Sequence, residues 1–125
     1  MGGFFGCPNT SSGGSGGTSF ATLGARLPFT SPAGAAVAAA PAGFSSSQAS
    51  PTGRLLVTLA ADTTWVSLTA GYDGQMLELV VVAGNFTLTL PQADFGGVGD
   101  HVLGLNNAIL LYYDTTDGAW QVTSP

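Results

Sequence analysis

Residues 74–90 read GQMLELVVVAGNFTLTL and carry the strongest secondary-structure signal in the chain. Residues 76–82 are rich in branched apolar side chains, and residues 86–90 alternate between apolar residues and threonine with a period of two. Both patterns are typical of β-strands. Ala83, Gly84 and Asn85 lie between them and tolerate positive φ, so the stretch predicts a β-hairpin.

Two of the expected strands are apolar at consecutive positions, over residues 79–82 (LVVV) and 108–111 (AILL). Because side chains alternate between the two faces of a strand, both faces of these strands must be covered. A single thin sheet cannot do this, so we expect a second sheet or a neighbouring subunit. The residues expected at a subunit interface are Val80, Val81, Val82, Ile109 and Leu111.

Short strands separated by turn residues recur from residue 54 onward. We expect strands at 55–60, 64–70, 75–82, 86–91, 108–114 and 119–123, with turns rich in Asp, Asn and Gly between them. No window of ten or more residues has a period of 3.6, so no long helix is expected. This spacing predicts an all-β fold, a small antiparallel sandwich or barrel-like domain over residues 54–125. Trp65 and Trp120 are expected at strand ends, with their indole N–H groups toward backbone carbonyls or the surface.

A glycine-rich loop is expected between residues 92 and 105. It contains Phe95 and Val98, and we expect these apolar side chains to plug the open end of the sheet pair.

Residues 1–53 differ in composition from the rest of the chain. They hold five of the seven prolines, eleven of the 19 glycines and no acidic residue. Such a segment is expected to be an extended attachment arm that lies along a partner, because alone it buries too little apolar area to offset its ordering entropy. The alternative is that it packs back on its own domain. The anchors expected along the arm are Phe4, Phe5, Phe20, Leu23, Leu27, Phe29, Val37 and Phe44.

Charge is scarce: Lys and Arg number 2, Asp and Glu number 7, and only 7% of residues are charged against 45% hydrophobic. A net charge of −5 with so few basic residues argues against a nucleic-acid partner. No apolar run reaches the roughly 18 to 20 residues of a membrane-spanning helix, and the N-terminus lacks the features of a signal peptide. We therefore expect synthesis in the cytoplasm and no membrane partner. The single cysteine, Cys7, cannot form an internal disulfide.

Catalytic, metal and cofactor sites are not expected. Asp100 and His101 form an acid–base pair without a nucleophile beside them, and residues 114–118 (DTTDG) lack the ligands of a calcium loop. Asp73, Glu78 and Asp94 are interpreted as solvated turn or strand-end residues. The glycines at 96–99 do not follow the strand and precede the helix that a phosphate-binding loop requires.

The stretches 74–79 (GQMLEL), 85–90 (NFTLTL), 107–114 (NAILLYYD) and 118–120 (GAW) together resemble the small β domains of tailed-bacteriophage virion proteins. These include capsid decoration (cement) proteins, head fibres and the distal parts of tail fibres. The resemblance is one of alternation and turns, and it covers about half the chain, residues 64–122. The segment 1–53 departs from it, being longer and richer in Gly, Ala and Pro than a simple fibre-attachment peptide.

The resemblance implies a non-enzymatic virion protein, usually a homotrimer, that attaches through its N-terminal segment to the major capsid protein or another virion subunit. Oligomerisation is also expected on physical grounds, because a domain of about 72 residues without a disulfide or metal site has too small a core to be more than marginally stable alone. The alternative hypothesis is a tail-fibre or glycan-binding module in which Tyr72, Tyr112, Tyr113 and Trp120 stack on sugar rings. A small virion hydrolase is a third hypothesis, without a catalytic constellation to support it.

Overall fold

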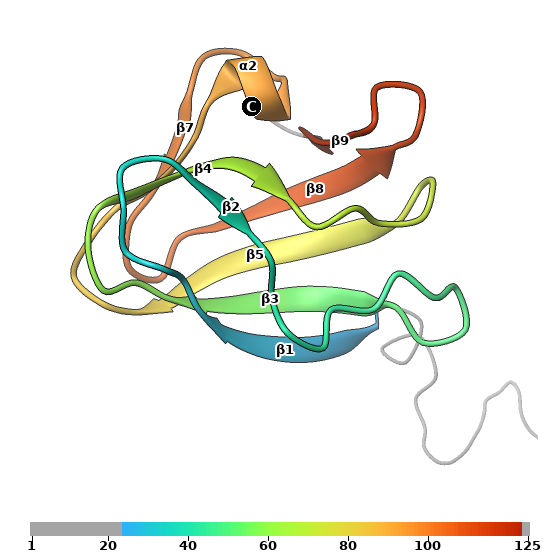
Figure 1. Cartoon of the computed structure of the whole chain (residues 1–125), viewed down its shortest axis with the longest axis horizontal. Helices are drawn as coiled ribbons and strands as arrows, with labels where there is room; N and C mark the ends of the chain where they lie inside the picture. The colour runs from blue at the N-terminus through green and yellow to red at the C-terminus, as the bar shows by residue number, and fades with distance from the viewer. Residues whose placement is uncertain (1–23, 124–125) are drawn as a thin grey trace, which may run out of the picture.

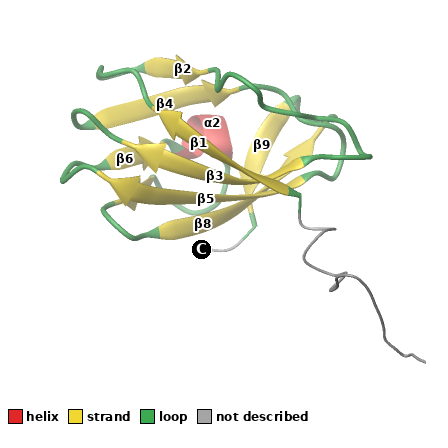
Figure 2. Ribbon diagram, turned by 90° about the horizontal axis from the view of Figure 1, so that it is seen from below, coloured by secondary structure: helices red, strands yellow, loops and turns green. Residues whose placement is uncertain are grey.

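The computed structural model describes residues 24–123, which form two β-sheets packed face to face (Figures 1 and 2). The expectation of an all-β fold is confirmed. We call the five-stranded sheet, in the order β1-β3-β5-β8-β9, sheet A, and the four-stranded sheet, in the order β2-β4-β6-β7, sheet B. The strands of sheet A are β1 (Ala25–Thr30), β3 (Thr52–Thr58), β5 (Met76–Ala83), β8 (Ala108–Asp114) and β9 (Ala119–Val122).

The strands of sheet B are β2 (Val37–Ala39), β4 (Thr63–Leu68), β6 (Leu88–Leu90) and β7 (His101–Leu103). A four-residue helix, α2 (Gln92–Phe95), connects β6 to β7. All six strands expected from the sequence are present, with ends within three residues of the expected ones. The sequence did not predict β1, β2, β7 or α2.

From β1 to β6 the chain alternates between the two sheets, so the first six strands form three turns of a flattened coil (Figure 2). In sheet A, β1 pairs with β3 and β3 with β5 in parallel; in sheet B, β2 pairs with β4 and β4 with β6 in parallel. Parallel neighbours need a long crossover, and here a strand of the opposite sheet supplies it. Only β7, β8 and β9 add antiparallel pairs. The expectation of an antiparallel domain is therefore wrong for the first six strands.

The expected hairpin across residues 83–85 is also wrong, because β5 and β6 lie in different sheets. Gly84 has a φ of 95°, and a Cβ there would collide with the carbonyl of Leu59. The Leu59 N–H donates to the carbonyl of Ala83 at 3.0 Å, which holds this turn against the preceding turn of the coil. The reversal thus carries the chain across the sandwich instead of back along the same sheet.

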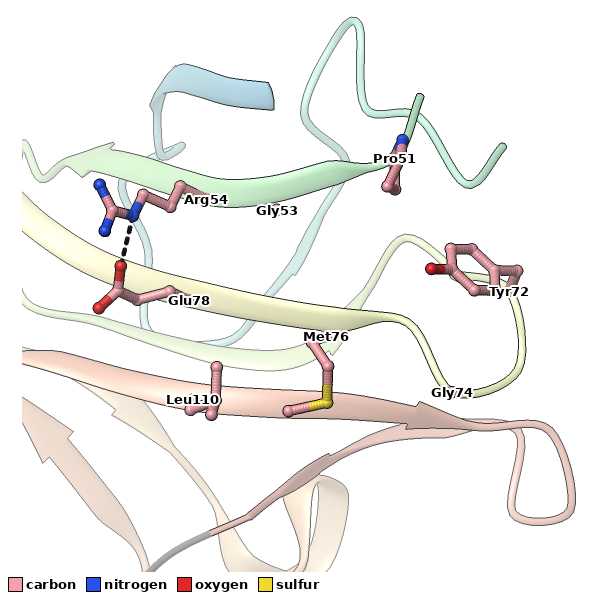
Figure 3. Close-up of a pocket in the computed structure, with 8 residues that line it drawn as sticks. All are labelled: Pro51, Gly53, Arg54, Tyr72, Gly74, Met76, Glu78 and Leu110. Atoms are coloured by element: carbon pink, nitrogen blue, oxygen red, sulfur yellow. Dashed lines mark ion pairs between the residues drawn. The ribbon is translucent and has the colours of Figure 1, made fainter. Parts of the chain in front are cut away.

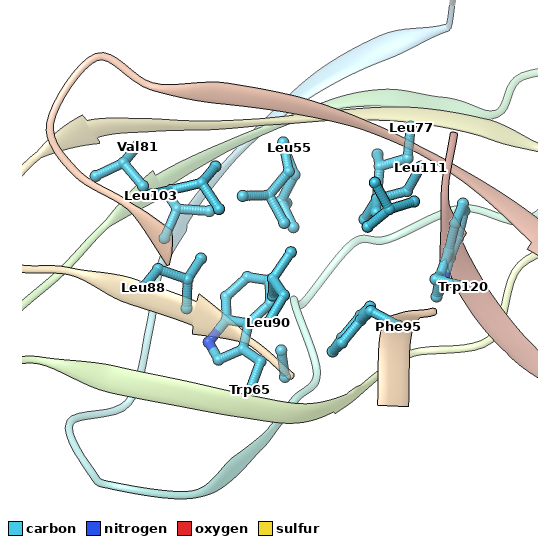
Figure 4. Close-up of a cluster of buried hydrophobic side chains, with 14 of the residues drawn as sticks. Leu55, Trp65, Leu77, Val81, Leu88, Leu90, Phe95, Leu103, Leu111 and Trp120 are labelled. Atoms are coloured by element: carbon cyan, nitrogen blue, oxygen red, sulfur yellow. The ribbon is translucent and has the colours of Figure 1, made fainter. Parts of the chain in front are cut away.

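The core lies between the sheets and follows the alternation of each strand (Figure 4). On β5, Leu77, Leu79 and Val81 point inward and are fully buried. Phe95 of α2 is buried between the sheets, as expected for the glycine-rich loop, but Val98 in the same loop is exposed and plugs nothing. The remaining buried hydrophobic residues are Ala39, Leu55, Val57, Leu59, Trp65, Leu88, Leu90, Leu103, Leu111, Tyr113, Trp120 and Val122.

Both tryptophans are buried with their indole N–H groups satisfied. Trp120 Nε1 donates to the carbonyl of Thr69 at 2.8 Å, as expected. Trp65 lies within β4, not at its end, and donates to the hydroxyl of Ser31 at 2.9 Å instead of to a carbonyl.

Residues 24–53 belong to the sandwich, which corrects the expectation of an arm that extends to residue 53. They supply β1, β2 and the first two residues of β3, so the expected domain boundary at 53/54 cuts through a strand. Leu27, Phe29, Val37 and Phe44 pack against the core, with the Phe29 and Phe44 rings edge-on to Trp65 and Trp120. Parallel ladders pair one edge of β1 and of β2, and the apolar side chains of the segment reach the core, so its composition does not prevent folding. The other expected anchors, Phe4, Phe5, Phe20 and Leu23, lie outside the described residues.

Gln75 connects this N-terminal part to β5. Its side chain is fully buried, and its Nε2 donates to the carbonyls of Ser45 and Thr52 at 3.1 and 2.8 Å. Its Oε1 accepts from the Tyr72 N–H at 3.2 Å. One amide thus satisfies three main-chain groups from two distant segments.

Candidate functional site

The outward side of sheet A is the most distinctive surface of the described chain. Its central part, which we call the outer face of sheet A, presents the side chains that alternate with the buried ones on β3, β5 and β8. They are Arg54, Leu56, Met76, Glu78, Val80, Val82, Leu110 and Tyr112. The strand register places Leu56 opposite Val80, and Glu78 opposite Leu110.

Four large apolar residues of this face are well exposed: Met76 at 45%, Val82 at 43%, Leu110 at 41% and Tyr112 at 36%. Leu56 and Val80 lie between them and are partly exposed. Single exposed apolar residues are common, but a contiguous group on adjacent strands is a candidate binding surface.

One ion pair crosses the middle of this apolar face. Arg54 Nε lies 2.6 Å from Glu78 Oε1, and the two side chains are 44% and 36% exposed. The residues are direct neighbours in the β3–β5 register (Figure 3). At this exposure the pair adds little to folding stability. Because the pair lies among apolar side chains, a partner that covered this face would have to accommodate one positive and one negative charge.

A groove of about 310 Å³ adjoins the ion pair at the end of the sheet where β3 and β5 begin. Figure 3 shows Met76 and Leu110 along the strands and Tyr72 on the loop beyond. Gly53 has no partner in the β1–β3 register, which is irregular at this position, and it lies just before the first β3–β5 pair, Arg54 and Glu78. Such irregularities recur where a strand leaves room for a ligand or partner. The lining residues are Pro51, Gly53, Arg54, Tyr72, Gly74, Met76, Glu78 and Leu110.

The residues expected at a subunit interface divide between the two faces of sheet A. Val80 and Val82 lie on the outer face, as an interface requires. Val81 and Leu111 are fully buried in the core, and Ile109 packs against it, so these three are not on a free surface. The alternation expected from the sequence is confirmed, but the sequence could not say which of the two sets faces outward. It also did not single out Leu56, Met76 or Leu110.

The four aromatic residues expected to stack on sugars divide into two exposed or groove-lining residues and two buried ones. Tyr72 lines the groove and Tyr112 is exposed on the outer face. Tyr113 and Trp120 are buried and pack edge-on with ring centroids 5.3 Å apart. Only Tyr72 and Tyr112 are therefore accessible to a ligand.

Four of the polar residues considered for catalysis or metal binding have hydrogen-bond partners within the fold: His101, Asp100, Asp114 and Asp73. His101 Nε2 lies 3.1 Å from the carbonyl of Gly96, and Asp100 accepts from the Gln92 N–H at 3.0 Å, so both hold the loop around α2. Asp114 accepts from the Thr116 N–H at 2.9 Å, within the β8–β9 turn. Asp73 accepts from the N–H and hydroxyl of Thr115, which joins two loops.

Residues 24–123 contain no group of three or more His, Cys, Asp or Glu side chains that could hold a metal ion. Cys7 lies outside this range. Over the same range, no helix has the length and apolarity needed to cross a membrane.

Comparison of the chain with protein-family models, with curated proteins and with solved structures finds no match. The fold therefore defines the class, a two-sheet β-sandwich built on a parallel coil.

Proposed function

We propose that this chain is a non-catalytic structural protein of a tailed-bacteriophage virion, a capsid decoration or head-fibre protein that stabilises neighbouring subunits. Two things support the proposal. The strand and turn pattern of residues 64–122 resembles such proteins, and the outer face of sheet A offers an apolar surface suited to assembly. The exposed apolar face is the observation that supports assembly, and the resemblance supplies the virion as its setting.

The outer face of sheet A is suited to assembly because few charged side chains protect it from association. Lys and Asp/Glu side chains commonly keep soluble β proteins from associating, and here the chain has no lysine and only 7% charged residues. Burial of exposed Met, Val, Leu and Tyr side chains contributes about 25 cal/mol for each Å² removed from water. A protein made for assembly gains from such a surface, whereas a free monomer is exposed to unspecific association.

Attachment to the particle is assigned in this proposal to residues 1–23. Residues 24–53 are part of the sandwich, so the apolar positions left for attachment are Phe4, Phe5, Phe20 and Leu23. The experiment compares the full chain with a chain lacking residues 1–23 in co-sedimentation with particles that lack the protein. The full chain should sediment with the particles, and the shortened chain should stay in the supernatant.

Copy number distinguishes the two virion roles. Quantitative mass spectrometry of purified particles should find hundreds of copies for a decoration protein and a few dozen or fewer for a fibre. Absence of the chain from purified particles would overturn the virion assignment altogether.

A second candidate function is binding of a saccharide in the groove beside Tyr72. It is favoured by one observation: the groove combines an aromatic wall and apolar residues with the donors and acceptors of Arg54 and Glu78. Sugar recognition uses this combination of stacking and paired polar groups. Titration of the protein with glycan fragments, followed by amide chemical shifts, tests it. Shifts at Gly74 and Met76 that vanish in Tyr72→Ala would support it.

A further inference from the structure

We infer that the outer face of sheet A binds the same face of a second copy of this chain, across a two-fold axis that runs parallel to the strands between β3 and β5. The inference deepens the proposed function by naming a second copy of the chain as one partner of this surface. It rests on the proposed function only where it gives the dimer a role in virion assembly. The contact itself follows from the register of the charged and apolar side chains.

The charges on this face are self-complementary. Arg54 on β3 and Glu78 on β5 are neighbours in one row across the strands, and both project outward. A rotation of 180° about the proposed axis lays β3 of one copy over β5 of the other and keeps each row in place. Arg54 then meets Glu78 of the second copy, and Glu78 meets Arg54. Four charges of alternating sign gather at the axis, so neither Arg54 nor Glu78 is buried without a partner. Arg26, the exposed neighbour of Arg54 on the edge strand β1, lies in the same row at the margin of the contact.

The same rotation brings apolar rows together. Leu56 lies opposite Val80 in the register, so Leu56 of one copy meets Val80 of the other. A two-fold axis perpendicular to the strands and through the charged row would instead place Arg54 on Arg54 and Glu78 on Glu78. Like charges in contact are unfavourable, so the pair selects the parallel axis. The resulting arrangement is an aligned packing of two sheets, with a spacing of about 10 Å.

The groove lies close to the proposed axis and offers space for a side chain of the second copy. It opens at the starts of β3 and β5, where Pro51, Gly53 and Met76 are among its lining residues. In the proposed pair, Met76 of the second copy lies over the start of β3 and can enter the groove. Methionine is flexible and fills irregular spaces well, which suits this position.

The size of the face predicts a weak but specific dimer. Eight residues of β5 span about 26 Å. The proposed axis also lays β1 of one copy over β8 of the other, so the contact extends across four strands, about 19 Å in width, which gives roughly 500 Å² per copy. A total near 1,000 Å² lies at the lower end of specific interfaces. A dissociation constant in the micromolar range is therefore expected for the isolated protein, with tighter association when copies are held on a particle.

A dimer differs from the homotrimer that the phage resemblance implies. A closed three-fold assembly uses two different patches on each subunit, whereas a two-fold contact uses one patch twice. Arg54 and Glu78 lie together on one patch, which is the arrangement that a two-fold contact requires.

The experiment uses the full chain and a charge exchange. Sedimentation equilibrium from about 5 to 200 micromolar should show a monomer–dimer equilibrium for the natural chain. Arg54→Glu and Glu78→Arg should each weaken self-association by about tenfold or more, since each places like charges across the axis. An equimolar mixture of these two variants should restore dimers to at least the natural level, and the double variant Arg54→Glu/Glu78→Arg should self-associate within about threefold of it.

Val102→Asp serves as the matched control, because Val102 is exposed on β7 in the other sheet. It should leave the dissociation constant unchanged. Near-natural circular dichroism and thermal midpoints of all variants show that they are folded.

Three results would overturn the inference: a natural chain that stays monomeric to 200 micromolar, a trimer, or a mixture that associates no better than its two components. None of these results depends on particles, so a failure of this inference is distinguishable from a failure of the virion assignment, which co-sedimentation tests.

Discussion

The indole N–H of Trp65 donates to the hydroxyl of Ser31 at 2.9 Å, between two residues that are 34 positions apart and both buried. Ser31 directly follows β1 in sheet A, and Trp65 lies on β4 in sheet B. The Ser31 N–H in turn donates to the carbonyl of Thr58 at 2.9 Å, at the end of β3. One serine therefore joins both sheets and connects the N-terminal strand to one of the two buried tryptophans of the core.

Ser31→Ala should destabilise the fold by about 1 to 3 kcal/mol, because it leaves a buried indole N–H without its acceptor. Chemical denaturation followed by tryptophan fluorescence measures the change. Ser67→Ala, on the exposed side of β4, is the matched control and should change stability by less than about 0.5 kcal/mol. An equally small effect at Ser31 would show that water or another group replaces the hydroxyl.

Removal of residues 1–53 should abolish folding, whereas removal of residues 1–23 should leave the sandwich intact. The longer deletion takes away β1, β2 and the start of β3, and it uncovers Trp65 and Trp120. Dispersion of amide signals in NMR spectra of the two shortened chains measures the outcome. A well-dispersed spectrum for residues 54–125 alone would restore the domain boundary expected from composition.

Gln75→Glu should be more damaging than Gln75→Met, although glutamate has nearly the shape of glutamine. The carboxylate replaces an N–H donor with an oxygen that faces the carbonyls of Ser45 and Thr52. A loss of about 3 kcal/mol or more is expected for Glu at neutral pH, and roughly 2 kcal/mol for Met, which only leaves the carbonyls unpaired. Thermal unfolding at pH 7 compares them, and the reverse order would contradict the assigned orientation of the amide.

Pro28→Thr should leave the fold intact but increase association through the free edge of β1. The N–H groups of Ala25 and Ser31 donate toward β3, so by alternation the nitrogen of Pro28 lies on the free edge, where it has no hydrogen to offer. Threonine supplies that donor and opens the edge to strand addition. Sedimentation velocity should show species larger than a dimer, with stability changed by no more than about 1 kcal/mol. Thr30→Ser on the same strand should show no such species.

Much of sheet A was predictable from sequence because its strands follow hydrophobic alternation. Residues 108–114 match β8 at both ends, and the strand expected at 75–82 is β5 shifted by one residue. β1 was missed because Pro28 at its centre argues against an inner strand, and the structure places that strand at an edge. β7 was missed because it is three residues long and is preceded by glycines.

Pairing of the strands could not be predicted in the same way. Gly84 and Asn85 indicate a reversal, but a turn residue does not specify whether the chain returns to its own sheet or crosses to the other. For the candidate site, too, the sequence predicts the strand but not which of its side chains face outward. Residues 79–82 are apolar throughout, so the sequence identifies a strand covered on both sides, while only the packing of sheet B shows that Val81 is inside and Val80 outside.

The coiled path of the first six strands has a consequence for the speed of folding. Leu27 pairs with Leu55 and Leu55 with Leu79, so each parallel contact in sheet A joins residues 28 and then 24 positions apart. None of these contacts can form as a local hairpin, and each must close a loop before any burial compensates for the lost chain entropy. Refolding is therefore expected on a scale of milliseconds to seconds, with the antiparallel β8–β9 pair as its earliest local contact. During that interval the apolar strands β3 and β5 remain unpaired in the newly made chain, and high local concentrations favour pairing between molecules over pairing within one.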